Sequence, residues 1–270
     1  HSPIRRLVPT DWLQKKGKIE LLQLLFLGKP PPMRFASKVV LTLFFVFFIG
    51  CGGSGTENQG ESSQENTVSS GKIDTIPAEA LLYDDASKLA YKTGEDVPFS
   101  GKVVWYFSEG RIQQETEYRN GRENGSTIWW YEDGTRAGQT FHHAGVLDGP
   151  LVQWYPGGEA KELQGMYNSG RRDGQYVKWH KNGGKRSVTN YEKGKRVGRA
   201  VGWHENGSKA WEANWANDLA HGWCAEWYKG ESLRNKKTYV NGKLHGVETW
   251  WYEHGQKSYE ITWAQGRREG

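Results

Sequence analysis

The chain has 270 residues, 35 of them glycine and 14 tryptophan, and a formal net charge of +5. Residues 1–50 carry eight Lys/Arg against two acids, so the rest of the chain has 28 basic and 29 acidic residues. The total charge therefore gives no reason to expect a nucleic-acid partner. The two cysteines, Cys51 and Cys224, are too few for a disulfide framework and form no metal-binding pair.

The first 50 residues have the pattern of a targeting segment. Residues 1–32 lack a regular hydrophobic period and precede the first methionine, Met33, so we interpret them as a non-native upstream extension. Residues 33–50 hold two basic residues followed by the apolar run Val39–Ile49, in which Thr42 is the one polar residue. This run is shorter than the roughly 20 residues of a spanning helix and has the size of a signal-peptide core.

The apolar run ends at Ile49-Gly50-Cys51, which resembles the lipobox of bacterial lipoproteins, with Phe48 where that family usually has leucine. The resemblance implies cleavage before Cys51 and acylation of this cysteine, and two or more acyl chains hold a protein stably on a membrane. It also implies a lipid-anchored protein of the bacterial cell envelope. Because Gly52 and not aspartate follows the cysteine, we expect the outer membrane or cell surface more than the inner membrane. An ordinary cleaved signal and a transmembrane anchor are the alternatives.

Two segments separate this cysteine from the regular part of the chain. Residues 51–76 are rich in Gly, Ser, Gln and Glu, and we predict that they are the lipidated cysteine and a disordered linker. Residues 77–100 are predicted to form an N-terminal capping hairpin, with strands at Leu89–Tyr91 and Val97–Phe99 around a glycine turn. A short helical turn is expected over residues 78–82.

From residue 101 to the end the sequence repeats every 24 residues, with one step of 25. A glycine opens each copy, and we number the positions of a repeat from this glycine as zero. A fixed period of 20–50 residues indicates a repeat architecture. The opening glycines, which we expect at turns, are Gly101, Gly125, Gly149, Gly174, Gly198, Gly222 and Gly246, and Gly270 begins an eighth copy.

Positions 3 and 5 of the repeat are regular, whereas position 4 between them varies, and this is the period-2 pattern of a half-buried strand. We expect positions 3 and 5, with an aromatic residue near position 17, to form ladders that bury one face of a sheet. Positions 2, 4 and 6 then form the exposed, variable surface. The structural aromatic ladder at position 5 is Tyr106, Trp130, Trp154, Trp179, Trp203, Trp227 and Trp251.

Asp-Gly and Asn-Gly pairs such as Asp133-Gly134 and Asn206-Gly207 follow the first strand of a repeat, and they favour hairpins in which both turn residues have positive φ. A second turn leads into the next opening glycine. The sequence therefore predicts an all-β fold, an elongated antiparallel meander of about 14 strands over residues 101–270. One hairpin alone is marginally stable, so stability must come from stacking, and a sheet of this length should twist or curl.

The spacing G-x-x-x-x-W-Y-x-x-G followed by Y-x-x-G-x-x-x-G resembles the MORN-repeat variant, in seven copies over residues 101–270. The resemblance implies tandem β-hairpins. Bacterial members are often labelled as antitoxins of toxin–antitoxin systems or are lipoproteins without an assigned role. MORN repeats at large are linked to protein scaffolding and to binding of anionic phospholipids.

The rings at position 6 are the candidate binding face, because lined along a groove they would stack on sugars or on peptide side chains; packing among themselves is the alternative. The histidines among them lack a carboxylate or cysteine at metal-ligand spacing, so we expect no metal. No catalytic motif is present, so we expect no catalytic residue, no cofactor and no enzyme activity. The candidate binding face is Tyr131, Tyr155, His180, His204, Tyr228 and Tyr252.

These patterns favour a non-enzymatic, membrane-anchored repeat protein that binds a protein partner or acts as a scaffold at the cell envelope. One alternative is an antitoxin- or immunity-like protein that neutralises a cognate toxin. Another is binding of a glycan or an anionic lipid by the groove. Residues 171–199 hold ten Lys/Arg against two acids, which is typical of solvated surface or of contact with an acidic partner or lipid headgroups.

Overall fold

The computed structural model describes residues 4–6 and 73–269. The expected upstream extension, the signal peptide and Cys51 lie outside the described residues, apart from a short strand at Ile4–Arg6. The expected linker, residues 51–76, also lies outside the described residues except for its last four. The end of this linker is ordered, because Thr75 and Ile76 belong to a strand and Ile76 is buried. Among the described residues no helix is long and apolar enough to cross a bilayer.

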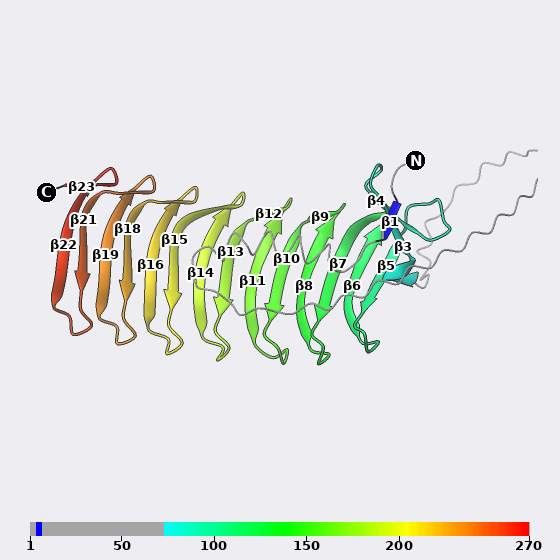
Figure 1. The fold of residues 1–270 in the computed structure, drawn as a ribbon, viewed down its shortest axis with the longest axis horizontal. Helices are drawn as coiled ribbons and strands as arrows, with labels where there is room; N and C mark the ends of the chain where they lie inside the picture. The colour runs from blue at the N-terminus through cyan, green and yellow to red at the C-terminus, as the bar shows by residue number, and fades with distance from the viewer. Residues whose placement is uncertain (1–3, 7–72, 270) are drawn as a thin grey trace, which may run out of the picture. The chain divides into compact units, whose positions relative to one another are not determined.

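Seven consecutive hairpins form one open, twenty-stranded sheet in which each hairpin lies beside the next (Figure 1). The predicted all-β meander is thereby confirmed, with fourteen long strands and several short ones. The long strands are β5 (Gly101–Tyr106), β6 (Ile112–Arg119), β7 (Arg122–Trp130), β8 (Arg136–His143), β10 (Gly149–Trp154), β11 (Lys161–Asn168), β13 (Gly174–Trp179), β14 (Lys185–Glu192), β15 (Lys195–Trp203), β16 (Lys209–Ala216), β18 (Gly222–Trp227), β19 (Leu233–Val240), β21 (Gly246–Trp251) and β22 (Lys257–Ala264).

The short strands belong to the second turns and to the N-terminal cap. After the second turn, each of five short strands pairs with the strand that precedes it. These are β9 (Val146–Leu147), β12 (Arg171–Arg172), β17 (Leu219–Ala220), β20 (Lys243–Leu244) and β23 (Arg267–Glu269). The cap contains β2 (Thr75–Pro77), the 3-10 turn η2 (Ala78–Ala80), β3 (Leu81–Asp84) and β4 (Leu89–Lys92), and β1 (Ile4–Arg6) pairs with β3.

The two kinds of turn differ from the prediction. Positive φ at two successive residues is general in the second turns, as at Asn120 (49°) and Gly121 (74°), whereas among the first turns it occurs only at Gly157 and Gly158. In the other first turns only the residue at the end of a four-residue loop has positive φ, as at Gly134 (83°). There the preceding Asp or Asn uses its side chain instead: Asp133 Oδ1 accepts the backbone N–H of Thr135 at 2.8 Å.

Each opening glycine lies at the start of a first strand or within it, has positive φ, and stands directly opposite the ring at position 17. It is therefore a bend in the strand and not the tip of a turn. Glycine adopts this positive φ without the strain that a side chain would bring. The seven pairs are Gly101–Tyr118, Gly125–His142, Gly149–Tyr167, Gly174–Tyr191, Gly198–Trp215, Gly222–Tyr239 and Gly246–Trp263.

This register places positions 0, 2 and 4 on one side of the sheet, which we call the glycine face, and positions 1, 3 and 5 on the other, the tryptophan face. The prediction that position 2 is surface is wrong, because position 2 is the most uniformly buried column. Val103, Thr127 and Ala200 are at most 1% exposed, whereas Tyr106 at position 5 is 48% exposed. The position-17 rings lie on the glycine face, so they cover position 2 and not positions 3 and 5.

The predicted cap is present, but its strand pairing is different. β4 pairs with β3, which precedes it, and Pro98 makes only an isolated bridge to Tyr91. The expected pairing of residues 89–91 with residues 97–99 is therefore reduced to this antiparallel bridge and one backbone bond, in which the Phe99 N–H donates to the Ala90 carbonyl at 2.8 Å. The helical turn is confirmed as η2. The cap and the first hairpin share a continuous apolar core, and β2 adds to β5 in parallel. The core residues are Ile76, Ala78, Leu81, Ala90, Phe99, Val103, Trp105 and Tyr118.

Candidate binding surface

The glycine face is closed by its own side chains. The Trp129 indole lies over Gly138 and the Trp211 indole lies over Gly202, so that a β-carbon at either glycine would overlap the ring. Because each ring fills the space that a glycine leaves, this face packs without a second layer of structure.

The side chains at position 6 join neighbouring hairpins. The Tyr131 hydroxyl donates to the Trp154 carbonyl at 2.7 Å, and Tyr155 donates to Trp179 at 2.8 Å. His180 and His204 continue the series through Nε2, at 2.9 and 3.0 Å from the Trp203 and Trp227 carbonyls, and Tyr228 donates to Trp251 at 3.0 Å. A carbonyl only accepts, so both histidines carry their proton on Nε2.

These bonds change the interpretation of the candidate binding face. Five of its six members are half-buried and use their polar atom to hold the next repeat. Only Tyr252 is exposed, at 51%, and its ring stacks on His254 with centroids 5.5 Å apart. The contacts thus favour the alternative, in which the rings at position 6 pack within the array. The rings at position 5 are then the more accessible candidates for binding.

Replacing Tyr155 by phenylalanine should loosen one joint between repeats. The Trp179 carbonyl would lose its side-chain donor, and a neutral hydrogen bond contributes about 1 kcal/mol. We expect a loss of that size in urea unfolding, with faster amide exchange in β10 and β13. Tyr106→Phe is the control, because the Tyr106 side chain is exposed and makes no such bond. Equal losses of stability from the two changes would contradict the claim that the Tyr155 hydrogen bond holds neighbouring repeats together.

The tryptophan face carries a stripe in which rings and cations alternate. The side chain at position 11, or 12 in the longer third repeat, lies directly opposite position 5 of its own hairpin. We call these two columns the tryptophan–cation stripe. Its pairs are Tyr106–Ile112, Trp130–Arg136, Trp154–Lys161, Trp179–Lys185, Trp203–Lys209, Trp227–Leu233 and Trp251–Lys257.

Several cations of the stripe also reach the ring of the following hairpin. The Arg136 guanidinium carbon is 5.9 Å from the Trp154 ring centroid, Lys161 Nζ is 6.0 Å from that of Trp179, and Lys209 Nζ is 4.8 Å from that of Trp227. Such cation–π contacts hold both partners in place. The six tryptophans are half-buried, so their outer surfaces remain accessible. The predicted ladder at position 5 is therefore only half-buried and does not form a closed core.

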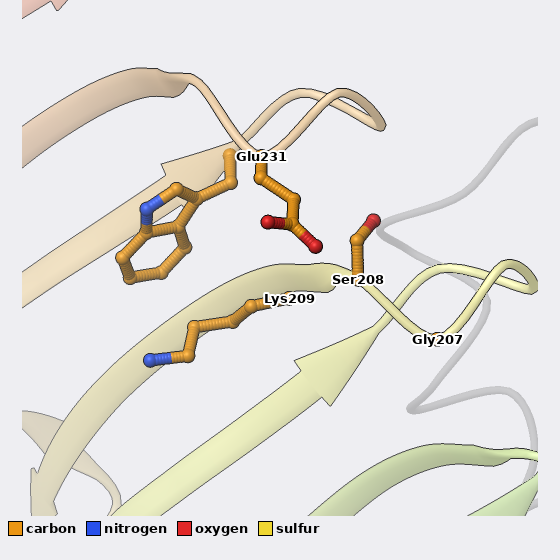
Figure 2. Close-up of a pocket in the computed structure, with 5 residues that line it drawn as sticks. Gly207, Ser208, Lys209 and Glu231 are labelled. Atoms are coloured by element: carbon orange, nitrogen blue, oxygen red, sulfur yellow. The ribbon is translucent and has the colours of Figure 1, made fainter.

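Between two hairpins the stripe is hollowed into an open pocket of about 310 Å³, lined by Gly207, Ser208, Lys209, Trp227 and Glu231 (Figure 2). Lys209 Nζ lies 4.8 Å from the centroid of the Trp227 ring, and the Glu231 carboxylate faces Ser208. The pocket therefore combines one aromatic wall with groups of both charge signs.

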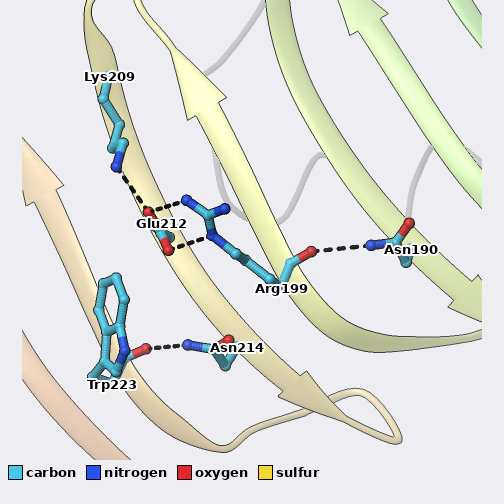
Figure 3. A network of polar contacts seen from close by, with 6 residues as sticks. All are labelled: Asn190, Arg199, Lys209, Glu212, Asn214 and Trp223. Carbon is cyan, nitrogen blue, oxygen red and sulfur yellow. Dashed lines mark hydrogen bonds and ion pairs between the residues drawn. The ribbon is translucent and has the colours of Figure 1, made fainter.

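Lys209 is ion-paired within the protein (Figure 3). The Glu212 carboxylate is 4% exposed and accepts bonds from Arg199 Nε and Nη2 at 2.5 and 2.9 Å and from Lys209 Nζ at 2.9 Å. The Arg199 guanidinium, and after it Lys209, holds the pKa of the Glu212 carboxyl below its usual range, although burial opposes this. Nearby, the Asn190 amide donates to the Arg199 carbonyl at 3.1 Å.

A carboxyl whose pKa is lowered by folding stabilises the fold above its unfolded pKa, near 4.5, and this stabilisation is lost as the pH falls through the folded value. Glu212→Gln should therefore cost about 1 kcal/mol at pH 7, since both cations are partly exposed, and little at pH 3. Urea unfolding at the two pH values checks this. The exposed Glu253→Gln is the control, with no measurable change. A Glu212→Gln cost that is independent of pH would contradict the account.

The described residues hold no cluster of three or more His, Cys, Asp or Glu side chains suited to a metal ion. Cys224 is free and buried, and burial raises the pKa of its thiol. Sequence reasoning missed the cations at position 11, although their recurrence in five of seven copies is visible in the sequence. In comparisons with known proteins, no family model and no curated protein matches the chain.

Proposed function

We propose that this protein is a non-enzymatic binding or scaffold module that docks a protein partner along its tryptophan face. The observation that carries the proposal is the tryptophan–cation stripe. It sets an accessible ring on six consecutive hairpins, with a cation beside most of them, in a regular row. The glycine face and position 6 are occupied by packing, so the stripe is the repeated surface that remains. Tryptophan side chains are among the usual anchors of protein interfaces.

We further propose that the module acts at the bacterial cell envelope, attached through a lipid on Cys51. This part rests on the lipobox-like sequence before Cys51. Labelling with a palmitate analogue tests it. Label on the parent and not on Cys51→Ser supports the anchor, and equal labelling of both rejects it.

Site-specific crosslinking tests the docking surface. A photoreactive p-benzoylphenylalanine replaces Lys185 on the tryptophan face or, as the control, Lys195, which is also exposed but lies at the other end of its hairpin. We expect one protein to be crosslinked in envelope extracts from position 185 and not from position 195. Crosslinks of equal strength from both positions, or none to protein at position 185, would reject the proposal.

A further inference from the structure

The position-11 cation of the stripe is paired with a carboxylate in some hairpins and not in others. The difference depends on the residue at position 14 of the same hairpin. Where position 14 is glutamate, the cation is paired internally, as in Lys209–Glu212 at 2.9 Å and Lys257–Glu260 at 2.7 Å. In the second, third and fourth repeats this position is neutral, occupied by Gln139, Gln164 and Val188.

As a consequence, Arg136, Lys161 and Lys185 have no carboxylate of a described residue within ion-pair distance, and all three are exposed. Lys161 Nζ donates only to the amide oxygen of Gln164, at 3.2 Å. With Trp130, Trp154 and Trp179 opposite them, these cations form three successive ring–cation units. We call this part of the stripe the unpaired stretch. Charge complementarity calls for an acidic occupant there.

The spacing of the units identifies the backbone of that occupant. Successive hairpins are two strands apart, so the units recur every 9.6 Å or so, at about 4.8 Å per strand. A polyproline II helix has three residues per turn and a rise of about 3.1 Å, and thus returns to the same side every 9.3 Å or so. Over the unpaired stretch this mismatch amounts to only about 0.6 Å.

Other peptide conformations fit the spacing less well. A β-strand presents side chains on one side about every 6.7 Å. An α-helix returns to one face after seven residues, or about 10.5 Å, which gives a mismatch of roughly 2 Å over the same stretch. Proline-rich polyproline II segments are also a known class of ligand for aromatic-lined grooves.

We propose that the unpaired stretch binds a polyproline II segment of about nine residues with an acidic side chain at every third position. Each carboxylate pairs with Arg136, Lys161 or Lys185, and each proline ring packs on the tryptophan opposite. This inference rests on the proposed function and specifies the partner.

Fluorescence anisotropy with a labelled peptide of four Glu-Pro-Pro triplets tests it on the full chain at low ionic strength. Two comparison peptides have Lys-Pro-Pro and Glu-Gly-Gly triplets. We expect binding of the first peptide and at least tenfold weaker binding of both comparison peptides. The double variant Gln139→Glu, Gln164→Glu gives two of the cations an internal carboxylate, as in Lys209–Glu212, and should weaken binding about tenfold, since each exposed pair contributes about 0.7 kcal/mol.

The matched control is Lys209→Gln with Lys257→Gln, which removes two cations that are already paired and should change the affinity less than twofold. Unfolding midpoints show whether every variant is folded. The inference is overturned if the Lys-Pro-Pro or Glu-Gly-Gly peptide binds equally well, or if the double variant binds as the parent does. It is also overturned if the stretch captures heparin or phosphatidylserine vesicles but not the Glu-Pro-Pro peptide. A protein crosslinked at position 185 without Glu-Pro-Pro binding rejects this inference and leaves the proposed function intact.

Discussion

Replacing Gly101 by alanine is expected to detach the cap from the array. A β-carbon at this position would overlap the Asp74 carbonyl oxygen and the tip of the Phe99 ring. The carbonyl belongs to backbone that is fixed by the Lys102 N–H, which donates to it at 2.8 Å, so neither partner can move without loss. We expect a cost of about 3 kcal/mol, the upper end for overpacking.

Urea unfolding measures this cost, and amide exchange locates it. Leu81 and Ala90, which are fully buried in the core shared by cap and first hairpin, should lose protection first. Gly198→Ala is the matched control, an opening glycine with nothing near its missing β-carbon. It has positive φ, so alanine there should cost only about 1 kcal/mol. Equal costs at the two positions would show that the cap is not held at Gly101.

Gly202→Ala is expected to destabilise the array by about 1–3 kcal/mol, because the new methyl group would overlap the Trp211 indole. Gly202 lies in an extended strand without positive φ, so the new methyl group causes no backbone strain. It would instead overlap the Trp211 indole, which lies across the glycine. The same pairing of ring and glycine occurs at Trp129 and Gly138.

A double-mutant cycle separates this contact from other effects. In a Trp211→Ala background the space above residue 202 is open, and the additional cost of Gly202→Ala should fall close to zero. Gly230→Ala is the control, because this glycine has an ordinary φ and nothing within reach of a β-carbon. A Gly202→Ala cost that persists without the indole would contradict the packing described for this face.

The hairpin array could be predicted from the sequence because it depends on local signals. The 24-residue period, the alternation at positions 3 to 5 and the turn residues specify strands and their order. Which face is buried could not be predicted in the same way. It depends on the register that sets Tyr118 opposite Gly101 and so places the position-17 rings over position 2. A shift of one residue reverses such an assignment.

The candidate binding face could not be assessed from the sequence for a similar reason, since its contacts depend on how neighbouring repeats are placed. Tyr131 and His180 looked available for a ligand because their partners are backbone carbonyls of the next repeat, which no side-chain pattern reveals. One signal was present: after the first copy, position 6 always holds a ring with a hydrogen-bonding atom. The pairing of Lys209 with Glu212, and its absence at Lys185, likewise required the strand register.

Oxidative footprinting of the indoles tests most directly the claim that the tryptophan face, and not the glycine face, receives a partner. Hydroxyl-radical labelling would be compared for the free chain and for its complex with the protein crosslinked at position 185. We predict that Trp130, Trp154 and Trp179 become protected in the complex, while Trp211 and Trp250 keep their reactivity. Protection of Trp211 and Trp250 with unchanged labelling at position 5 would contradict the account.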